Sequence, residues 1–130
     1  MQNKKLFFMI IDDDKLNNII CQTIIAKNYP QSTYLSFIDP NEALEYLQNT
    51  VNKQPDVIFL DIHMPYVDGW KFLENFKKLE ISRKAYIVII SSSINERDIR
   101  KASEHPLVKA YIEKPIVIDK INQTLKDLLE

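Results

Sequence analysis

Four short, continuous apolar runs alternate with longer amphipathic stretches along this chain, and that alternation constrains the fold more than any other feature. The runs are Leu6–Ile11, Val57–Leu60, Tyr86–Ile90 and Ala110–Ile112. Because apolar residues follow one another without polar interruptions, the runs are typical of parallel strands that are covered on both faces. A fifth run, from Thr33 to Asp39, alternates between apolar and polar residues and suits an edge strand.

The stretches between these runs carry apolar residues at helical spacing. The apolar stripes are Leu16, Ile19, Ile20, Thr23 and Ile24; Ala43, Leu44 and Leu47; Phe72, Leu73, Phe76 and Leu79; and Ile121, Leu125 and Leu128. The more polar segment from Ser93 to His105 predicts a further, weaker helix. Asp39, Asp68 and Asp119 stand where helices are expected to begin. Strands and helices that alternate in this way predict an α/β fold, a doubly wound five-stranded parallel sheet with five helices on its two faces.

Length and composition limit the classes of function. A chain of 130 residues with no linker or repeat predicts one domain, residues 1–130, with no output domain. The formal net charge of −1 gives no electrostatic argument for binding to nucleic acid or to a membrane surface. The apolar stretch near the N-terminus is too short for a signal peptide, and no run is long enough to span a membrane. The single cysteine, Cys21, lies among isoleucines and predicts a buried, inert thiol in the reducing cytoplasm.

Polar residues follow the predicted strands at the edge where open α/β sheets bind ligands. Asp12–Asp14 follow the first strand, Asp61 the third, Ser91 the fourth and Lys114 the fifth. Crowded carboxylates repel one another unless a cation joins them, and Mg²⁺ with oxygen ligands and waters suits such a group. Lys114 offers a point charge for a phosphate, and Ser91 a hydroxyl donor. These are the parts that phosphoryl transfer to a carboxylate requires.

Each of these residues also has a local explanation when it is taken alone. Asp12–Asp14 open a helix, where acidic residues are favourable caps. Asp68 suits a turn and cap before Gly69, and Ser91 and Lys114 suit a loop and an ordinary surface. The joint placement at the strand ends favours a site over a set of separate local roles.

Four segments in order resemble the receiver domain of bacterial response regulators. "MIIDDDKLNN" resembles the acidic first loop of that family, and "DIHMPYVDGW" matches its D-x-x-M-P-x-x-D-G phosphorylation loop. "VIISSS" resembles the end of its fourth strand, and "AYIEKP" the end of its fifth. The resemblance covers nearly the whole chain and implies the flavodoxin-like strand order 2-1-3-4-5, in a stand-alone receiver of the single-domain type.

The resemblance also implies a reaction and its partners. Asp61 would be the phosphoacceptor, and a histidine kinase or a histidine phosphotransfer protein would be the donor. The output would pass to an unknown downstream protein, with no nucleic acid and no membrane involved. The protein would then be a phosphoacceptor switch in a two-component phosphorelay, with self-catalysed phosphoryl transfer and slow autodephosphorylation as its only catalysis.

Several other positions acquire roles from the same resemblance. Asp12, Asp13 and Asp61, with the backbone carbonyl of His63, would hold Mg²⁺, whereas Asp14 has no metal role. The His63 side chain is either an exposed bystander or a modulator of the phosphoryl lifetime. The remaining roles are phosphoryl contact by Ser91 and Lys114, an aromatic switch at Tyr111, and a cis peptide bond before Pro115.

The chain departs from the family pattern at two places. Serine replaces the commoner threonine at position 91, which keeps the hydroxyl group. The glycine usual before the fifth strand is absent, and His105–Pro106 stand in that region, which leaves the outline of this loop open.

Two other functions compete with a phosphorylated receiver. An aspartyl-phosphate phosphatase of the haloacid-dehalogenase type has a D-x-D pattern on its first strand, which Asp12 and Asp14 fit superficially. Such enzymes usually carry a cap and a longer chain, and the Met-Pro-x-x-Asp-Gly loop would be unexplained. A degenerate receiver that binds partners without phosphorylation is disfavoured because Asp12, Asp13, Asp61, Ser91 and Lys114 are all present.

Overall fold

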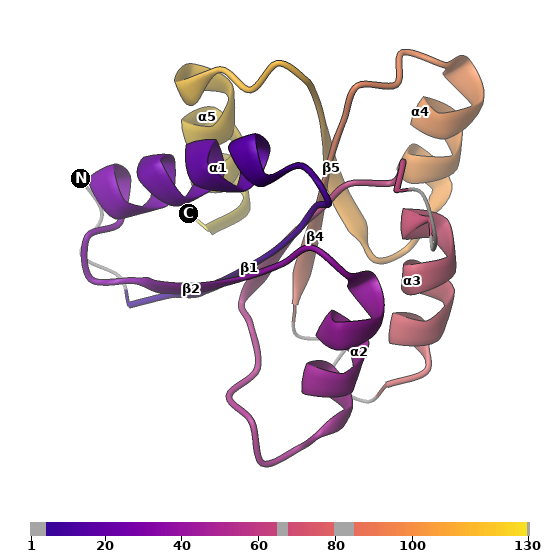
Figure 1. The fold of residues 1–130 in the computed structure, drawn as a ribbon. Helices are drawn as coiled ribbons and strands as arrows, with labels where there is room; N and C mark the ends of the chain where they lie inside the picture. The colour runs from indigo at the N-terminus through magenta and orange to yellow at the C-terminus, as the bar shows by residue number, and fades with distance from the viewer. Residues whose placement is uncertain (1–4, 65–67, 80–84, 130) are drawn as a thin grey trace.

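A computed structural model describes residues 5–64, 68–79 and 85–129 and contains one five-stranded parallel sheet (Figure 1). The strand order is β2-β1-β3-β4-β5, as predicted. Pro65, in the loop that resembles the family's phosphorylation loop, lies outside the described residues. The strands are β1 (Phe7–Ile11), β2 (Thr33–Phe37), β3 (Val57–Leu60), β4 (Tyr86–Ser91) and β5 (Val108–Glu113).

Within the described parts of the chain, five helices cover the two faces of the sheet, as the alternating pattern predicted. α1 and α5 pack on one face, and α2, α3 and α4 on the other (Figure 1). The helices are α1 (Lys15–Asn28), α2 (Pro40–Gln48), α3 (Gly69–Lys77), α4 (Glu96–Glu104) and α5 (Ile118–Leu129). Among the described residues, no helix is long and apolar enough to cross a membrane.

The strands are continuously apolar because each alternates its side chains between two buried layers. Met9 and Ile58 face the layer under α2, α3 and α4, whereas Phe8 and Phe59 face the layer under α1 and α5. The rings of Phe8 and Phe59 are stacked with centroids 5.9 Å apart. Two full layers of this kind hold the strand ends rigidly, and the candidate site lies at those ends.

Aspartates begin three helices by capping them. The side chain of Asp39 accepts a hydrogen bond of 2.8 Å from the amide of Asn41, and that of Asp68 accepts one of 2.8 Å from the amide of Lys71. Asp14 caps α1 in the same way. The first two caps confirm the sequence prediction, whereas Asp119 lies within the first turn of α5. Side-chain caps satisfy amides that the helix itself leaves unpaired.

The predicted apolar stripe of α1 is wrong in its first half. Leu16 and Ile19 are 66% and 56% exposed, and Ile20 is exposed as well. The helix instead buries Asn17, Asn18, Cys21, Ile24 and Ile25. The first turn lies over the polar end of the sheet, where two asparagines make hydrogen bonds that leucine and isoleucine cannot make.

The structure also describes Cys21 and the loop before β5. Burial raises the pKa of the Cys21 thiol to about 12, which makes it inert as expected.

The turn before β5 closes without glycine: the Val108 amide donates to the His105 carbonyl at 3.2 Å. The Leu107 amide donates to His105 Nδ1, also at 3.2 Å. His105 therefore organises the turn for which the family usually has a glycine.

Candidate functional site

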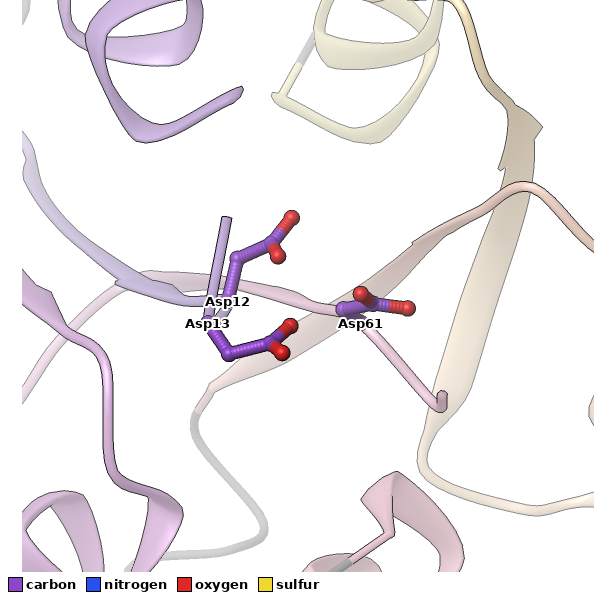
Figure 2. Close-up of side chains that lie close together, drawn as sticks. All are labelled: Asp12, Asp13 and Asp61. Atoms are coloured by element: carbon purple, nitrogen blue, oxygen red, sulfur yellow. The ribbon is translucent and has the colours of Figure 1, made fainter. Parts of the chain in front are cut away.

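Three aspartates meet at the carboxyl ends of two neighbouring strands. Asp12 and Asp13 follow β1 and Asp61 follows β3, and one carboxylate oxygen from each lies within 4.8 Å of the others. Figure 2 shows the side chains of Asp12 and Asp13 extending toward the side on which Asp61 lies. The cluster is built into the sheet, because the Asp61 amide donates to the Ile11 carbonyl at 2.9 Å. Three carboxylate ligands at this spacing suit a hard divalent cation.

Asp12 is held by groups from the first turn of α1. Its Oδ1 accepts a hydrogen bond of 2.9 Å from the Asp14 amide, and its Oδ2 accepts one from Asn17 Nδ2. Asn18 Nδ2 donates to the Asp12 carbonyl at 3.0 Å. Sequence reasoning missed both asparagines. The available signal was an Asn-Asn pair beside the apolar stripe of the predicted helix, directly after the acidic loop.

Lys114 lies between two of the carboxylates. Its Nζ is 3.0 Å from Asp12 Oδ2 and 3.3 Å from Asp61 Oδ2. Burial opposes the charge of the ammonium, but the hydrogen bond and the attraction of Asp12, followed by those of Asp61, outweigh it and raise the pKa of Lys114. The Lys114 amide donates to the Ser91 carbonyl at 2.8 Å, and the Lys114–Pro115 peptide bond is cis, as the resemblance implied.

Asp61 is buried, and its charge is poorly compensated. Burial is the largest influence and raises its pKa to about 6, whereas the hydrogen bond from the His63 amide lowers it. The charge of Asp12 raises this pKa further and that of Lys114 lowers it. Three carboxylates form the cluster, and the ammonium of Lys114 pairs with two of them, Asp12 and Asp61. The site therefore has an excess of negative charge that a bound cation would relieve.

Ser91 and Tyr111 are linked through one residue of the loop after β4. Ser91 is fully buried, and its Oγ accepts a hydrogen bond of 3.1 Å from the Ser93 amide. The Tyr111 hydroxyl donates to the Ser93 carbonyl at 2.8 Å. The backbone of Ser93 thus contacts both the Ser91 hydroxyl and the Tyr111 hydroxyl.

Gly69, the only glycine of the chain, lets α3 begin directly against the loop that carries Asp61. A Cβ atom at this position would lie 2.6 Å from the Asp61 carbonyl oxygen and 2.6 Å from Ile62 Cα. The Gly69 amide donates to the Ile62 carbonyl at 3.0 Å. The Asp-Gly pair thus has two separate functions: Asp68 caps the helix, and Gly69 allows close backbone packing.

The comparison with known families agrees with this geometry. Residues 8–126 match the response regulator receiver domain family. The chain belongs to this family. It is therefore related to the phosphorylated response regulators of two-component systems.

Relatives of known name support the assignment. The sporulation initiation phosphotransferase F of Bacillus subtilis is 27% identical over 129 residues, which cover 99% of this chain and 96% of that protein. The sensory/regulatory protein RpfC of Xanthomonas campestris pv. campestris is 25% identical over 127 residues, or 96% of this chain. The chain spans 17% of the length of RpfC, so it matches one part of that larger protein.

A solved structure confirms the fold. The two component response regulator from Cytophaga hutchinsonii is 28% identical and superimposes with a TM-score of 0.83, covering 97% of this chain and 98% of that one. The phosphatase alternative fits the structure poorly, because the second aspartate of its D-x-D pattern, Asp14, is the N-cap of α1.

Proposed function

We propose that this receiver domain is phosphorylated on Asp61. A carboxylate oxygen of Asp61 forms a bond to phosphorus as the P–N bond of a donor phosphohistidine breaks. The imidazole nitrogen keeps the electron pair and takes up a proton. The observation that carries the proposal is the position of Asp61: it stands at the end of β3, in contact with the Lys114 ammonium and within one cluster with Asp12 and Asp13.

The residues around Asp61 fit Mg²⁺ as the cofactor. Asp12, Asp13 and Asp61 supply three carboxylates, and the backbone carbonyl of His63 would complete the protein ligands. The ion, when bound, supplies positive charge against the transferred phosphoryl group. Lys114 contributes a second positive charge, and its ammonium is held by ion pairs to Asp12 and Asp61. Electrostatic stabilisation of this kind is the main contribution of a protein to phosphoryl transfer.

Phosphorylation of Asp61 would change the conformation of the domain first at Ser91 and then at Tyr111. A phosphoryl oxygen on Asp61 accepts a hydrogen bond from the Ser91 hydroxyl, which leaves its present position beside the Ser93 amide. The space that opens favours an inward position of the Tyr111 ring. The receiver then acts in the cytoplasm, and its output is a change in its affinity for a downstream protein.

The test is phosphorylation of Asp61→Asn. The asparagine has nearly the same shape but lacks the anionic oxygen that attacks phosphorus. We expect the parent to take up radiolabel from a phosphorylated histidine phosphotransfer protein with Mg²⁺, and Asp61→Asn to take up none. Asp14→Asn is the matched control, because asparagine also caps helices well and Asp14 belongs to the same acidic loop. Undiminished label on Asp61→Asn would overturn the assignment.

A further inference from the structure

Asp98, near the start of α4, joins three segments that surround the proposed acceptor. Its Oδ2 lies 3.0 Å from His63 Nε2 and accepts a hydrogen bond of 2.7 Å from Ser93 Oγ. Its Oδ1 accepts a hydrogen bond of 3.4 Å from Trp70 Nε1. The three partners come from the loop after Asp61, the loop after β4, and α3. A carboxylate is an acceptor with room for several donors, so one side chain ties these segments to α4.

The contacts of Asp98 are those of an ionised, largely buried carboxylate. Its side chain is 17% exposed. The hydrogen bond from Ser93 is the largest influence and lowers the pKa of Asp98; burial raises it, and the bonds from His63 and Trp70 lower it again. Lys101 Nζ lies 4.6 Å from the centre of the Trp70 ring, so α4 contacts the indole at two points. Hydrogen bonds to an ionised acceptor are stronger than neutral ones.

Apart from the contacts of Asp98 and Lys101, few side chains of α4 pack against the rest of the protein. Of its nine residues, all of them described, Ala102 alone is buried. Ile99 is 44% exposed, whereas α3, of the same length, buries Phe72, Leu73 and Phe76. Helices in proteins are held mainly by the packing of an apolar face. Because α4 nearly lacks such a face, the polar contacts of Asp98 account for an unusually large share of its attachment.

Both loop partners of Asp98 also contact the acceptor or the switch. The His63 amide donates to Asp61 Oδ1 at 3.0 Å. The Ser93 amide donates to Ser91 Oγ at 3.1 Å, and the Ser93 carbonyl accepts from Tyr111. If the Ser91 hydroxyl turns toward a phosphoryl group, Ser93 loses its amide partner, and the bond between its hydroxyl and Asp98 is disturbed.

We propose that Asp98 is a positioning residue that acts as a latch: it holds α4 and the loop between β4 and α4 in the resting arrangement, and phosphorylation has to break it. The latch rests on the proposed function, since it opposes the phosphorylated state. A contact made only in the resting state lowers the affinity for any group that favours the other state. Removal of the latch therefore raises that affinity, whereas loss of a merely structural residue lowers it or leaves it unchanged.

The test uses beryllofluoride with Mg²⁺ as the phosphoryl mimic, titrated against the full chain and followed by amide chemical shifts. We expect Asp98→Asn and Asp98→Ala to bind the mimic about 3- to 10-fold more tightly than the parent. Ser93→Ala removes one of the bonds to Asp98 without changing any charge, and we expect a smaller gain in the same direction. Glu104→Gln removes a negative charge at the other end of α4 and is the matched control. We expect it to bind like the parent.

A second readout needs no phosphoryl mimic. In the free protein we expect Asp98→Ala to speed amide hydrogen exchange about 10-fold in α4 while the amides of α2 keep their rates. The emission of Trp70, the only tryptophan, should also change, because the indole loses its hydrogen-bond partner.

The outcomes separate the latch from the proposed function. Equal or weaker binding of the mimic by Asp98→Asn and Ser93→Ala, with the parent binding normally, overturns the latch. A gain in Asp98→Asn that Glu104→Gln reproduces also overturns it, because the effect is then one of charge. Failure of the parent to bind the mimic overturns the proposed function, and unchanged exchange in α4 of Asp98→Ala then overturns the latch independently.

Discussion

Asp61 carries its charge in a place where burial and a neighbouring carboxylate oppose it. The pKa of Asp61 is raised to about 6, chiefly by burial. Asp12, whose charge also raises this pKa, shares the ammonium of Lys114 with Asp61. Reactive groups in proteins commonly carry a charge that the surrounding protein disfavours, and binding of the ligand relieves this unfavourable energy. The ionised Asp61 carboxylate should therefore measurably lower the free energy of unfolding of the metal-free protein.

We expect Asp61→Asn to stabilise the metal-free protein, and more so as the pH rises. A carboxyl group whose pKa is higher in the folded chain stabilises the fold while it is protonated, and this contribution is lost as the pH rises through about 6. Asparagine cannot ionise and avoids that loss. The gain in free energy of unfolding should grow between about pH 4 and about pH 7 to about 1–3 kcal/mol.

Urea unfolding of both proteins in chelator-treated buffer measures this difference. Added Mg²⁺ should reduce the advantage of Asp61→Asn, because the ion stabilises the parent more than the variant. Asp14→Asn, which alters an exposed cap, should show no comparable growth with pH. A constant difference across the pH range would contradict the assigned direction of the pKa.

Gly69→Ala should destabilise the fold by about 1–3 kcal/mol, because the added methyl group meets backbone atoms that cannot move aside cheaply. Those atoms, the Asp61 carbonyl oxygen and Ile62 Cα, each lie 2.6 Å from the Cβ position. They belong to the loop that carries the acceptor, so the affinity for Mg²⁺ should fall as well.

Urea unfolding and a Mg²⁺ titration followed by Trp70 emission test both effects of Gly69→Ala. Lys71→Ala, at an exposed position of the same helix, serves as the control. Parent-like stability of Gly69→Ala would show that α3 can shift away from the loop.

At the scale of the elements, α1 is the helix whose surface is least explained by the fold. Leu16, Ile19 and Ile20 are exposed, and Val117 and Ile118, which follow Lys114 closely, are 54% and 48% exposed. These two groups lie at the starts of α1 and α5, which pack on the same face of the sheet, and the contact between Lys114 and Asp12 joins the loops that precede the two helices. Apolar side chains exposed around a reactive group are typical of a surface that binds a protein partner.

We expect Ile19→Lys to slow phosphorylation by a protein donor about 10-fold or more, because a charge replaces apolar contact area at the rim of the site. Phosphorylation by acetyl phosphate, which needs no docking surface, should proceed at the rate of the parent. Val51→Lys is the matched control, since Val51 is 90% exposed in the loop between α2 and β3. Equal slowing with both donors would place the defect in the site and not in docking.

The elements also show which features the sequence could predict. Continuous apolar runs and capping aspartates are local signals, and they located the strands and most helix starts. The buried face of α1 escaped prediction because periodicity counts apolar residues, whereas the site needs the amides of Asn17 and Asn18. Asp98 escaped because its partners, His63 and Trp70, are distant in the sequence and meet it only after the sheet has formed.

For the whole molecule, the strand order places the site residues in a continuous row. β1, β3, β4 and β5 are neighbours, so Asp12, Asp61, Ser91 and Lys114 follow one another along one edge of the sheet. α4 packs beside β5 (Figure 1), and Tyr111 of β5 lines a pocket together with Ile99 and Ala102 of α4. In the proposed switch, a change at Ser91 would reach Tyr111 through the hydrogen bonds of Ser93.

We expect Ser91→Ala to accept phosphate on Asp61 but to transmit it poorly. The hydroxyl contributes one hydrogen bond to a charged group, about 1.5–3 kcal/mol, which moves a two-state population by about ten-fold or more. Without it, beryllofluoride should still shift the amides near Asp61 but should lose most of its effect around Tyr111 and α4. Ser92→Ala, at the exposed neighbouring serine, should respond like the parent.

Amide chemical shifts of the parent, Ser91→Ala and Ser92→Ala, recorded with and without beryllofluoride, test this prediction. Full distant shifts in Ser91→Ala would mean that the phosphoryl group reaches α4 through the His63 side of Asp98 and not through the serine.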